Sequence, residues 1–236
     1  MLTGEYVVLD GASALAIPTK YGQSLEVDIS EKKTVHWKSL DENGLVWFEE
    51  FFDLKNFEFE HISNEISITL SKILREARKL NPDFLSENEG VQITTKLDFP
   101  RNWGLGTSST LINNIAQWAN VDAFALLDAS FGGSGYDIAA AQNNSPILYK
   151  LNNGKPEFEQ VKLPWKFTDQ LFFVHLNQKQ DSKKGIAHYR NTKIDEKRIQ
   201  KISFISQALL SCETLPAFEK LMNVHEQLIS ESIDLP

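Results

Sequence analysis

The sequence has little cysteine and no long apolar run. Its single cysteine, Cys212, excludes an intrachain disulfide framework and a four-cysteine zinc site, and so little cysteine is typical of a reducing compartment. No hydrophobic run reaches the length of a membrane span, and the N-terminal MLTGEYVVLD carries acids where a signal peptide carries bases. These absences predict a cytoplasmic protein with no membrane partner.

Basic charge is also scarce. The 24 lysines and arginines face 32 acidic residues, which gives a net charge of -8 and argues against bulk nucleic-acid binding, because such binding depends on many cationic contacts to phosphate. The exception is residues 178 to 201, with eight basic residues against three acidic ones. This segment predicts either a solvated helix face or a small surface that faces phosphate.

The order of the predicted elements indicates an α+β protein. Strand patterns come first, in TGEYVVLD, SALAIPT, QSLEVDIS, TVHWKSL and LVWFEEFF, and we expect an antiparallel sheet from them. A helix is predicted from about Ile66 to Leu80, and GVQITTKLDF returns as a strand. Further helices follow in the segment after residue 106 and in DAFALLDAS, and QLFFVHLN reads as a late strand. Turn residues in 152 to 166 predict a boundary there, and so domains of residues 1–160 and 161–236.

The stretch PRNWGLGTSSTLINN suits an anion. Gly104 and Gly106 allow the backbone to approach a ligand closely, and the hydroxyls of Thr107, Ser108 and Ser109 precede a predicted helix. The free N–H groups at a helix start attract negative charge. The pattern is short, however, and a helix whose N-cap is Ser108 or Ser109 explains it equally well.

A second glycine-rich stretch, FGGSGYDIAAA, places Asp137 at the start of an alanine-rich helical run. A carboxylate in that position can orient or deprotonate a hydroxyl group. Aspartate is also a favoured N-cap residue, so a helix cap is the alternative. Three glycines in four residues are more than a cap requires.

Together with TGEYVVLDGASALAIP, these motifs resemble the GHMP kinase superfamily, which includes galactokinase, homoserine kinase, mevalonate kinase and phosphomevalonate kinase. GLGTSST is similar to the family's GLGSSA phosphate loop, GEYVVLDGASALA to its first conserved segment, and GSGYDIAAA to a GSGFD-type segment of phosphomevalonate kinases. Tyr6, where mevalonate kinases tend to have histidine, favours the phosphomevalonate branch. The resemblance implies a two-domain GHMP kinase fold, with an N-terminal domain like ribosomal protein S5 domain 2 and a ferredoxin-like C-terminal domain.

The resemblance also implies roles for particular residues. Asp137 would be the catalytic base, and Ser108 would help to hold Mg²⁺. The ATP phosphates would be bound by Gly104, Leu105, Gly106, Thr107, Ser108 and Ser109. A small-molecule acceptor would be bound by Glu5, Tyr6, Ser134, Gly135, Ser182, Lys183 and Lys184. The basic segment then has a use, because a phosphorylated acceptor needs cations.

The sequence departs from the family in two places. It has no counterpart of a P-G-K lysine before the GE segment, and it has no glycine after Gly185, where the family has a late glycine-rich loop. We therefore expect either a fragment of a longer protein or a degenerate member. Besides a kinase, which could be a homodimer, the alternatives are a decarboxylase of the same fold, a pseudokinase that binds nucleotide without turnover, and a structural module.

Overall fold

The computed structural model describes residues 1–59, 64–86, 89–175, 177, 182–192 and 194–233. The chain divides into two compact units, which we describe separately. Unit 1 combines Met1–Pro18 with Ser134–Pro236, and unit 2 is Thr19–Gly133. These two units are defined by how compactly the chain packs. The division into domains of residues 1–160 and 161–236 stays a prediction. Both units combine a sheet with helices, so the expected α+β class is confirmed.

Unit 2 contains a four-stranded sheet in the order β2-β5-β3-β4. Its strands are β2 (Gln23–Ser30), β3 (Thr34–Leu40), β4 (Val46–Asp53) and β5 (Gly90–Leu97). The pairing of β3 with β5 is parallel and the other two are antiparallel. The expectation that the early strand patterns form one antiparallel sheet was wrong, because β5 lies between β2 and β3, and SALAIPT supplies β1 (Ala14–Ala16) of the other sheet. The cause is α1 (Glu65–Leu80), which separates β4 from β5 and lets β5 enter beside β3.

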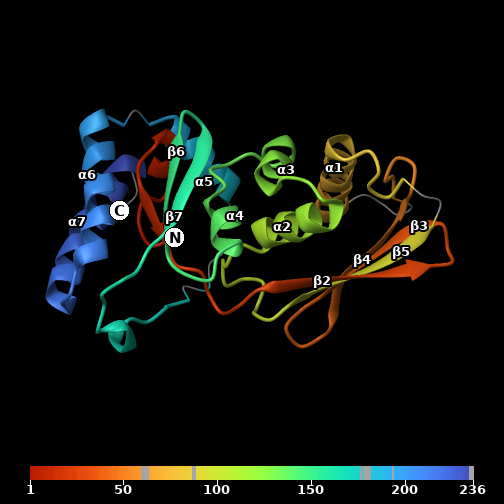
Figure 1. Ribbon diagram of the computed structural model, residues 1–236, viewed down its shortest axis with the longest axis horizontal. Helices are drawn as coiled ribbons and strands as arrows, with labels where there is room; N and C mark the ends of the chain where they lie inside the picture. Colours follow the sequence, from red (N-terminus) through yellow and green to blue (C-terminus); the bar gives the residue numbers. More distant parts are fainter. Residues whose placement is uncertain (60–63, 87–88, 176, 178–181, 193, 234–236) are drawn as a thin grey trace. The chain divides into compact units, whose positions relative to one another are not determined.

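Three helices lie on one side of this sheet (Figure 1). They are α1, α2 (Thr107–Ala119) and α3 (Ala123–Ser130), of which α3 lies farther from the sheet than α2. Strand β3 alternates buried and half-buried residues, as a sheet covered on one face requires. Its Val35 and Trp37, together with Leu74 of α1 and Ile112 of α2, are at most 1% exposed and belong to the buried core of the unit. The glycine loop at the start of α2 thus lies on a rigid layer.

Unit 1 contains a three-stranded antiparallel sheet in the order β1-β6-β7. Its strands are β1 (Ala14–Ala16), β6 (Ile147–Asn152) and β7 (Lys155–Gln160), and its α-helices are α4 (Tyr136–Ala141), α5 (Ser182–Arg190), α6 (Glu196–Ala208) and α7 (Leu215–Ile233). Short 3-10 helices are η1 (Val7–Asp10), η2 (Thr168–Gln170) and η3 (Leu209–Ser211). Strand β7 lies within the stretch that was expected to be an irregular boundary.

Two predicted strands of unit 1 were wrong. TGEYVVLD forms no strand; it bends through Gly4 and Tyr6, both with positive φ, into η1. The described part of QLFFVHLN up to His175 pairs with no strand, and Phe172 is 83% exposed there. None of the helices in the described residues has the length and apolar character needed to cross a bilayer.

Candidate functional site

The glycine loop of unit 2 leads directly into α2. Gly104 and Gly106 have φ of +73° and +76°, in the left-handed region that favours glycine. Gly106 is the N-cap residue, and it supplies no side-chain acceptor to the first turn of α2. Ser108 and Ser109 are the second and third residues of the helix, so neither serine is its N-cap. The alternative interpretation, in which Ser108 or Ser109 is the N-cap of this helix, is therefore wrong.

The loop presents an open surface. Gly104 is exposed, and a Cβ atom added to it would meet no heavy atom within 4 Å. Ser108 is exposed as well, while Leu105, Thr107 and Ser109 are half-buried. An anion could therefore reach the loop backbone, where the N–H groups and dipole of α2 are directed.

Contacts behind the loop hold α2 against β2. The Asn114 side-chain amide donates to the backbone oxygen of Gln23 over 2.7 Å, and the Thr110 hydroxyl lies 3.0 Å from Gln23 Oε1. Before the loop, the Trp103 N–H donates to the Pro100 oxygen and closes a turn. These bonds fix both ends of the loop.

Arg101, in that turn, was missed by the sequence reasoning. Its guanidinium carbon lies 3.6 Å from the centroid of the Trp47 ring, an arrangement that orients the cation. Burial lowers the pKa of Arg101, which still leaves it protonated. In the sequence, its only indication was its position, three residues before Gly104.

The other predicted residues lie in unit 1, where Asp137 belongs to a small acidic and phenolic group around Tyr136. Gly135, with φ of +77°, is the N-cap of α4, so Asp137 is the second helical residue and not its N-cap. Burial raises the pKa of Tyr136, and the charge of Asp137 and its hydrogen bond with the Tyr136 hydroxyl raise it further. Glu5 and Tyr6 add smaller contributions of the same sign. These four side chains are therefore neighbours.

Tyr6 connects this group to α5. Its ring stacks on Tyr189 at 5.9 Å between centroids, and a Cβ atom added to Gly185 would collide with the Tyr6 hydroxyl. Tyr6 thus packs directly on the helix that begins at Ser182. Ser182, Lys183 and Lys184 belong to α5 by their backbone, but their side chains lie outside the described residues.

Partial loss of hydration raises the pKa of the Glu5 carboxyl. The charge of Glu226 raises it further, whereas the N-terminal ammonium opposes the shift. Ser134, the remaining predicted residue, accepts a hydrogen bond from the Tyr149 hydroxyl through its backbone oxygen. Ser134 thus contacts Tyr149 through its backbone and not through its side chain.

The GE segment, which begins at Gly4 and Glu5, is positioned by a buried histidine of α7. His225 on α7 is 2% exposed, and its Nε2 accepts the Gly4 N–H over 2.9 Å. The ring proton is therefore on Nδ1, which lies 3.1 Å from Glu226 Oε1. A contact across 221 positions leaves no local signal in the sequence.

The donors for a metal ion are few. Within the described residues, no group of three or more histidine, cysteine, aspartate or glutamate side chains could hold a metal. A magnesium ion at the glycine loop would depend on the Ser108 hydroxyl and on phosphate oxygens. Magnesium commonly binds in this way, keeping several waters and substrate oxygens.

Known structures share the fold of this chain. L. major mevalonate kinase, in complex with R-mevalonate, aligns over 98% of this chain and 72% of its own, with a TM-score of 0.65 and 16% identity. Methanococcus jannaschii mevalonate kinase gives a TM-score of 0.68 at 14% identity, over 98% of this chain and 76% of its own. Streptococcus pneumoniae phosphomevalonate kinase, in complex with phosphomevalonate and AMPPNP, gives 0.61 at 15% identity, over 99% and 74%.

The chain has the GHMP kinase fold. The expectation drawn from its three motifs is confirmed at the level of the fold, since Lactococcus lactis galactokinase also aligns, with a TM-score of 0.51 and 15% identity. No family model matches the sequence, and no curated protein matches it. At identities this low the GHMP kinase fold is established, and the activity has to be argued from the site.

Proposed function

We propose that the chain is an ATP-dependent small-molecule kinase of the GHMP type. The observation that carries the proposal is the open glycine loop, whose N-cap Gly106 leaves the start of α2 without a side-chain cap. This loop occurs in a fold shared with mevalonate and phosphomevalonate kinases. Phosphoryl transfer consists mainly of positioning and charge neutralisation, which a glycine loop and a helix start can supply.

At the nucleotide end, the backbone from Gly104 to Ser109 would hold the ATP phosphates. The N–H groups of the first turn of α2 would donate to phosphate oxygens, and the Ser108 hydroxyl would contribute to Mg²⁺ binding. ATP supplies the phosphoryl group that is transferred. Arg101 is the nearest cation along the chain before the loop, and it would neutralise charge on the nucleotide.

At the acceptor end, Asp137 would accept the proton of the attacking hydroxyl group. The Tyr136 hydroxyl donates to this carboxylate and so restricts its orientation. Lys183 and Lys184 would pair with a phosphate on the acceptor. Tyr6 packs on Gly185 of the same helix, so it would help to place these lysines.

The acceptors to test first are mevalonate and phosphomevalonate, because these compounds are present in two of the similar structures. The protein would be incubated with Mg-ATP and each acceptor, and the products followed by ³¹P NMR. We expect formation of ADP together with a phosphorylated acceptor. ATP binding without product from any hydroxyl or phosphate acceptor would favour a pseudokinase, and release of carbon dioxide from mevalonate diphosphate would favour a decarboxylase.

A further inference from the structure

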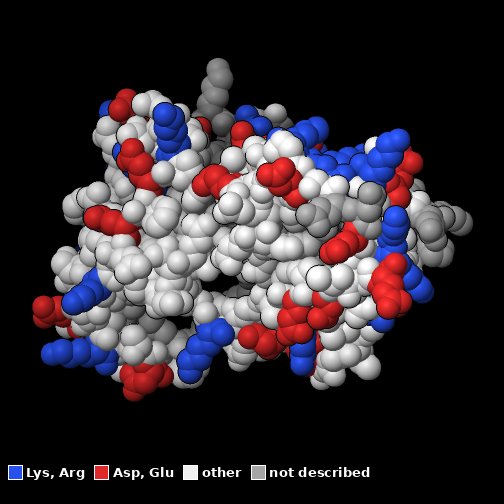
Figure 2. Space-filling view, turned by 45° about the vertical axis from the view of Figure 1, so that its right-hand side comes forward, with Lys and Arg blue, Asp and Glu red and all other residues white. Residues whose placement is uncertain are grey.

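A groove of about 440 Å³ in unit 2 is lined by α1 and by the turn that follows β4. Four basic side chains, Lys55, Arg75, Arg78 and Lys79, line it against one acidic side chain, Glu58. None of its lining residues belongs to the glycine loop. Figure 2 shows a run of basic side chains along the upper right of the molecule, and basic and acidic side chains both occur elsewhere on the visible face. The groove is thus a local excess of positive charge in a chain of net charge -8.

The turn that forms one wall is built by Asp53. Its carboxylate accepts the backbone N–H groups of Lys55, Asn56 and Glu58 over 2.8, 2.7 and 2.6 Å. These bonds hold the backbone of the turn, including the Asn56 carbonyl, in a defined position. The charge of Asp53 is therefore largely engaged in the wall.

Arg78 is also a structural part of the groove. Its guanidinium carbon lies 4.1 Å from the centroid of the buried Phe57 ring. Its nitrogens donate to four backbone oxygens, those of Leu54, Lys55, Phe84 and Leu85. Because its donors are used in these bonds, Arg78 holds the backbone around the groove in place and contributes positive charge to it.

Arg75 is held in a different way. Its Nε donates to the Asn56 carbonyl over 2.7 Å, which fixes the plane of the guanidinium. Among the described residues, no acceptor contacts its two terminal nitrogens, and no acid pairs with Lys55. A guanidinium fixed at Nε with both terminal nitrogens open matches a phosphate, which binds such a fork through two oxygens.

The acidic groups nearby leave this fork available. Lys79 is paired with Glu76 over 2.8 Å, so Glu76 neutralises that lysine rather than Arg75. Glu58 is exposed, and its side chain can turn into solvent. Arg75 and Lys55 therefore remain as the cations with open donors at the groove.

We propose that this groove is a second anion site, which binds a phosphate or diphosphate group of a small metabolite independently of the glycine loop. Arg75 holds the phosphate through both terminal nitrogens. Lys55 adds a flexible second cation from the opposite wall. Arg78 and the Asp53 turn keep the site preformed, so binding requires no reorganisation of the backbone.

The test is calorimetry with inorganic pyrophosphate on the Gly104→Val protein, in which the glycine loop is blocked. We expect saturable one-to-one binding at submillimolar concentration. Arg75→Gln should weaken it roughly ten- to a hundredfold, because a charge-assisted pair of hydrogen bonds is lost. Lys55→Gln should weaken pyrophosphate binding by a smaller factor. This variant still tests the proposal if Arg75→Gln does not fold.

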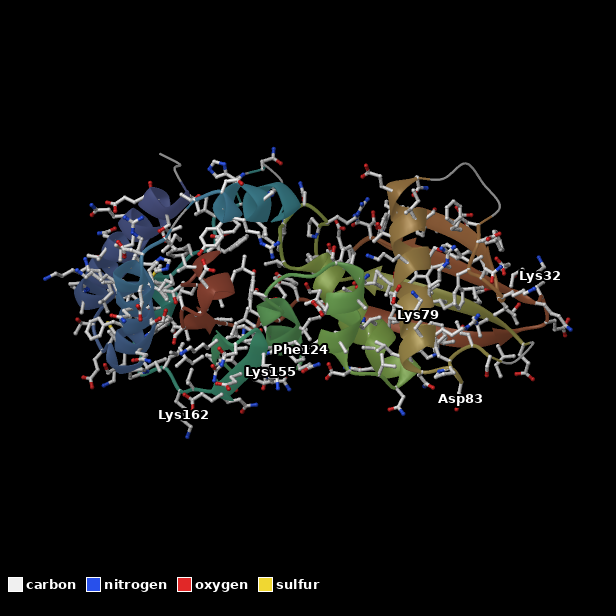
Figure 3. All side chains as sticks on the ribbon, turned by 90° about the horizontal axis from the view of Figure 1, so that it is seen from above. Lys32, Lys79, Asp83, Phe124, Lys155 and Lys162 are labelled. Atoms are coloured by element: carbon white, nitrogen blue, oxygen red, sulfur yellow. The ribbon has the colours of Figure 1, made fainter. Side chains whose placement is uncertain are left out.

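Lys32→Gln is the matched control, because it removes one exposed charge from the same unit. Figure 3 shows Lys32 at the tip of the strands, away from Lys79 on α1. If Lys32→Gln and Lys55→Gln weaken pyrophosphate binding equally, the proposal is overturned, and nonspecific attraction between charges explains the binding. Failure of pyrophosphate to bind would overturn it too, and binding of a hexaglutamate peptide in its place would indicate a contact surface for an acidic protein.

Discussion

Replacing Asp137 by asparagine separates catalysis from stability at the proposed acceptor site. The asparagine side chain would keep the size of the original and an oxygen that can accept from the Tyr136 hydroxyl, but it lacks the charge and the basicity. Loss of a general base typically lowers turnover about a hundredfold to ten-thousandfold. The KM for ATP should stay unchanged, because Asp137 is not part of the glycine loop.

The cost in stability can be worked out from two contacts. The hydrogen bond from Tyr136 would then join two neutral groups, which costs about 1 kcal/mol. The first turn of α4 also loses the negative charge of Asp137, which costs about 0.3–1 kcal/mol in helix-dipole energy. The sum of about 1–2 kcal/mol lowers Tm by roughly 2–8 °C in a chain of this size. The folded population at 25 °C is therefore almost unaffected.

The assay is steady-state phosphoryl transfer, with thermal unfolding of the same samples. Tyr136→Phe is the matched control, because it removes the hydrogen bond to Asp137 and keeps the carboxylate. It should lower kcat by a smaller factor than Asp137→Asn. Near-wild-type turnover in Asp137→Asn would refute the base assignment, and attack by the acceptor hydroxyl assisted by charge neutralisation alone would replace it.

Three further outcomes are expected. Lys183→Ala combined with Lys184→Ala should raise KM for a phosphorylated acceptor and leave KM for ATP unchanged; an equal rise in both would contradict the acceptor role. Because the pKa of Glu5 is raised above its usual 4.5, wild-type stability falls as pH rises through the folded pKa, so the Tm advantage of Glu5→Gln should grow from pH 4 to pH 7, and a constant difference would refute this. Arg101→Gln should weaken Mg-ATP binding roughly tenfold, as loss of one charge-assisted contact does; unchanged affinity in calorimetry would exclude Arg101 from the site.

The two glycine-rich loops could be predicted because their signals are local. Gly106 and Gly135 have positive φ immediately before a helix, and Gly104 has it three residues before α2, as glycine followed by a helical pattern indicates. The amphipathic pattern of α1 likewise needs no partner to be recognised. Such features depend on neighbours in the sequence.

The GE segment could not be predicted in the same way. Tyr6, Val7 and Val8 favour a strand by propensity, but the Gly4 N–H is held by His225 and Val7 and Val8 are buried in η1. The contact with His225 exists only after the chain has folded. The Arg75 groove was missed for the same reason, because the Asn56 carbonyl that orients Arg75 comes from a separate turn.

The most direct test of the kinase proposal is Mg-ATP affinity in Gly104→Val. A Cβ atom added at this position meets no heavy atom beyond its chain neighbours within 4 Å, so the change costs backbone strain at φ of +73° and blocks the space in front of the loop. Gly154→Val is the matched control, with φ of +76° in the β6–β7 turn and equally open surroundings. Both variants should lose similar stability by thermal unfolding, and only Gly104→Val should lose Mg-ATP binding in calorimetry. Equal affinity for Mg-ATP in the two variants would contradict nucleotide binding at this loop.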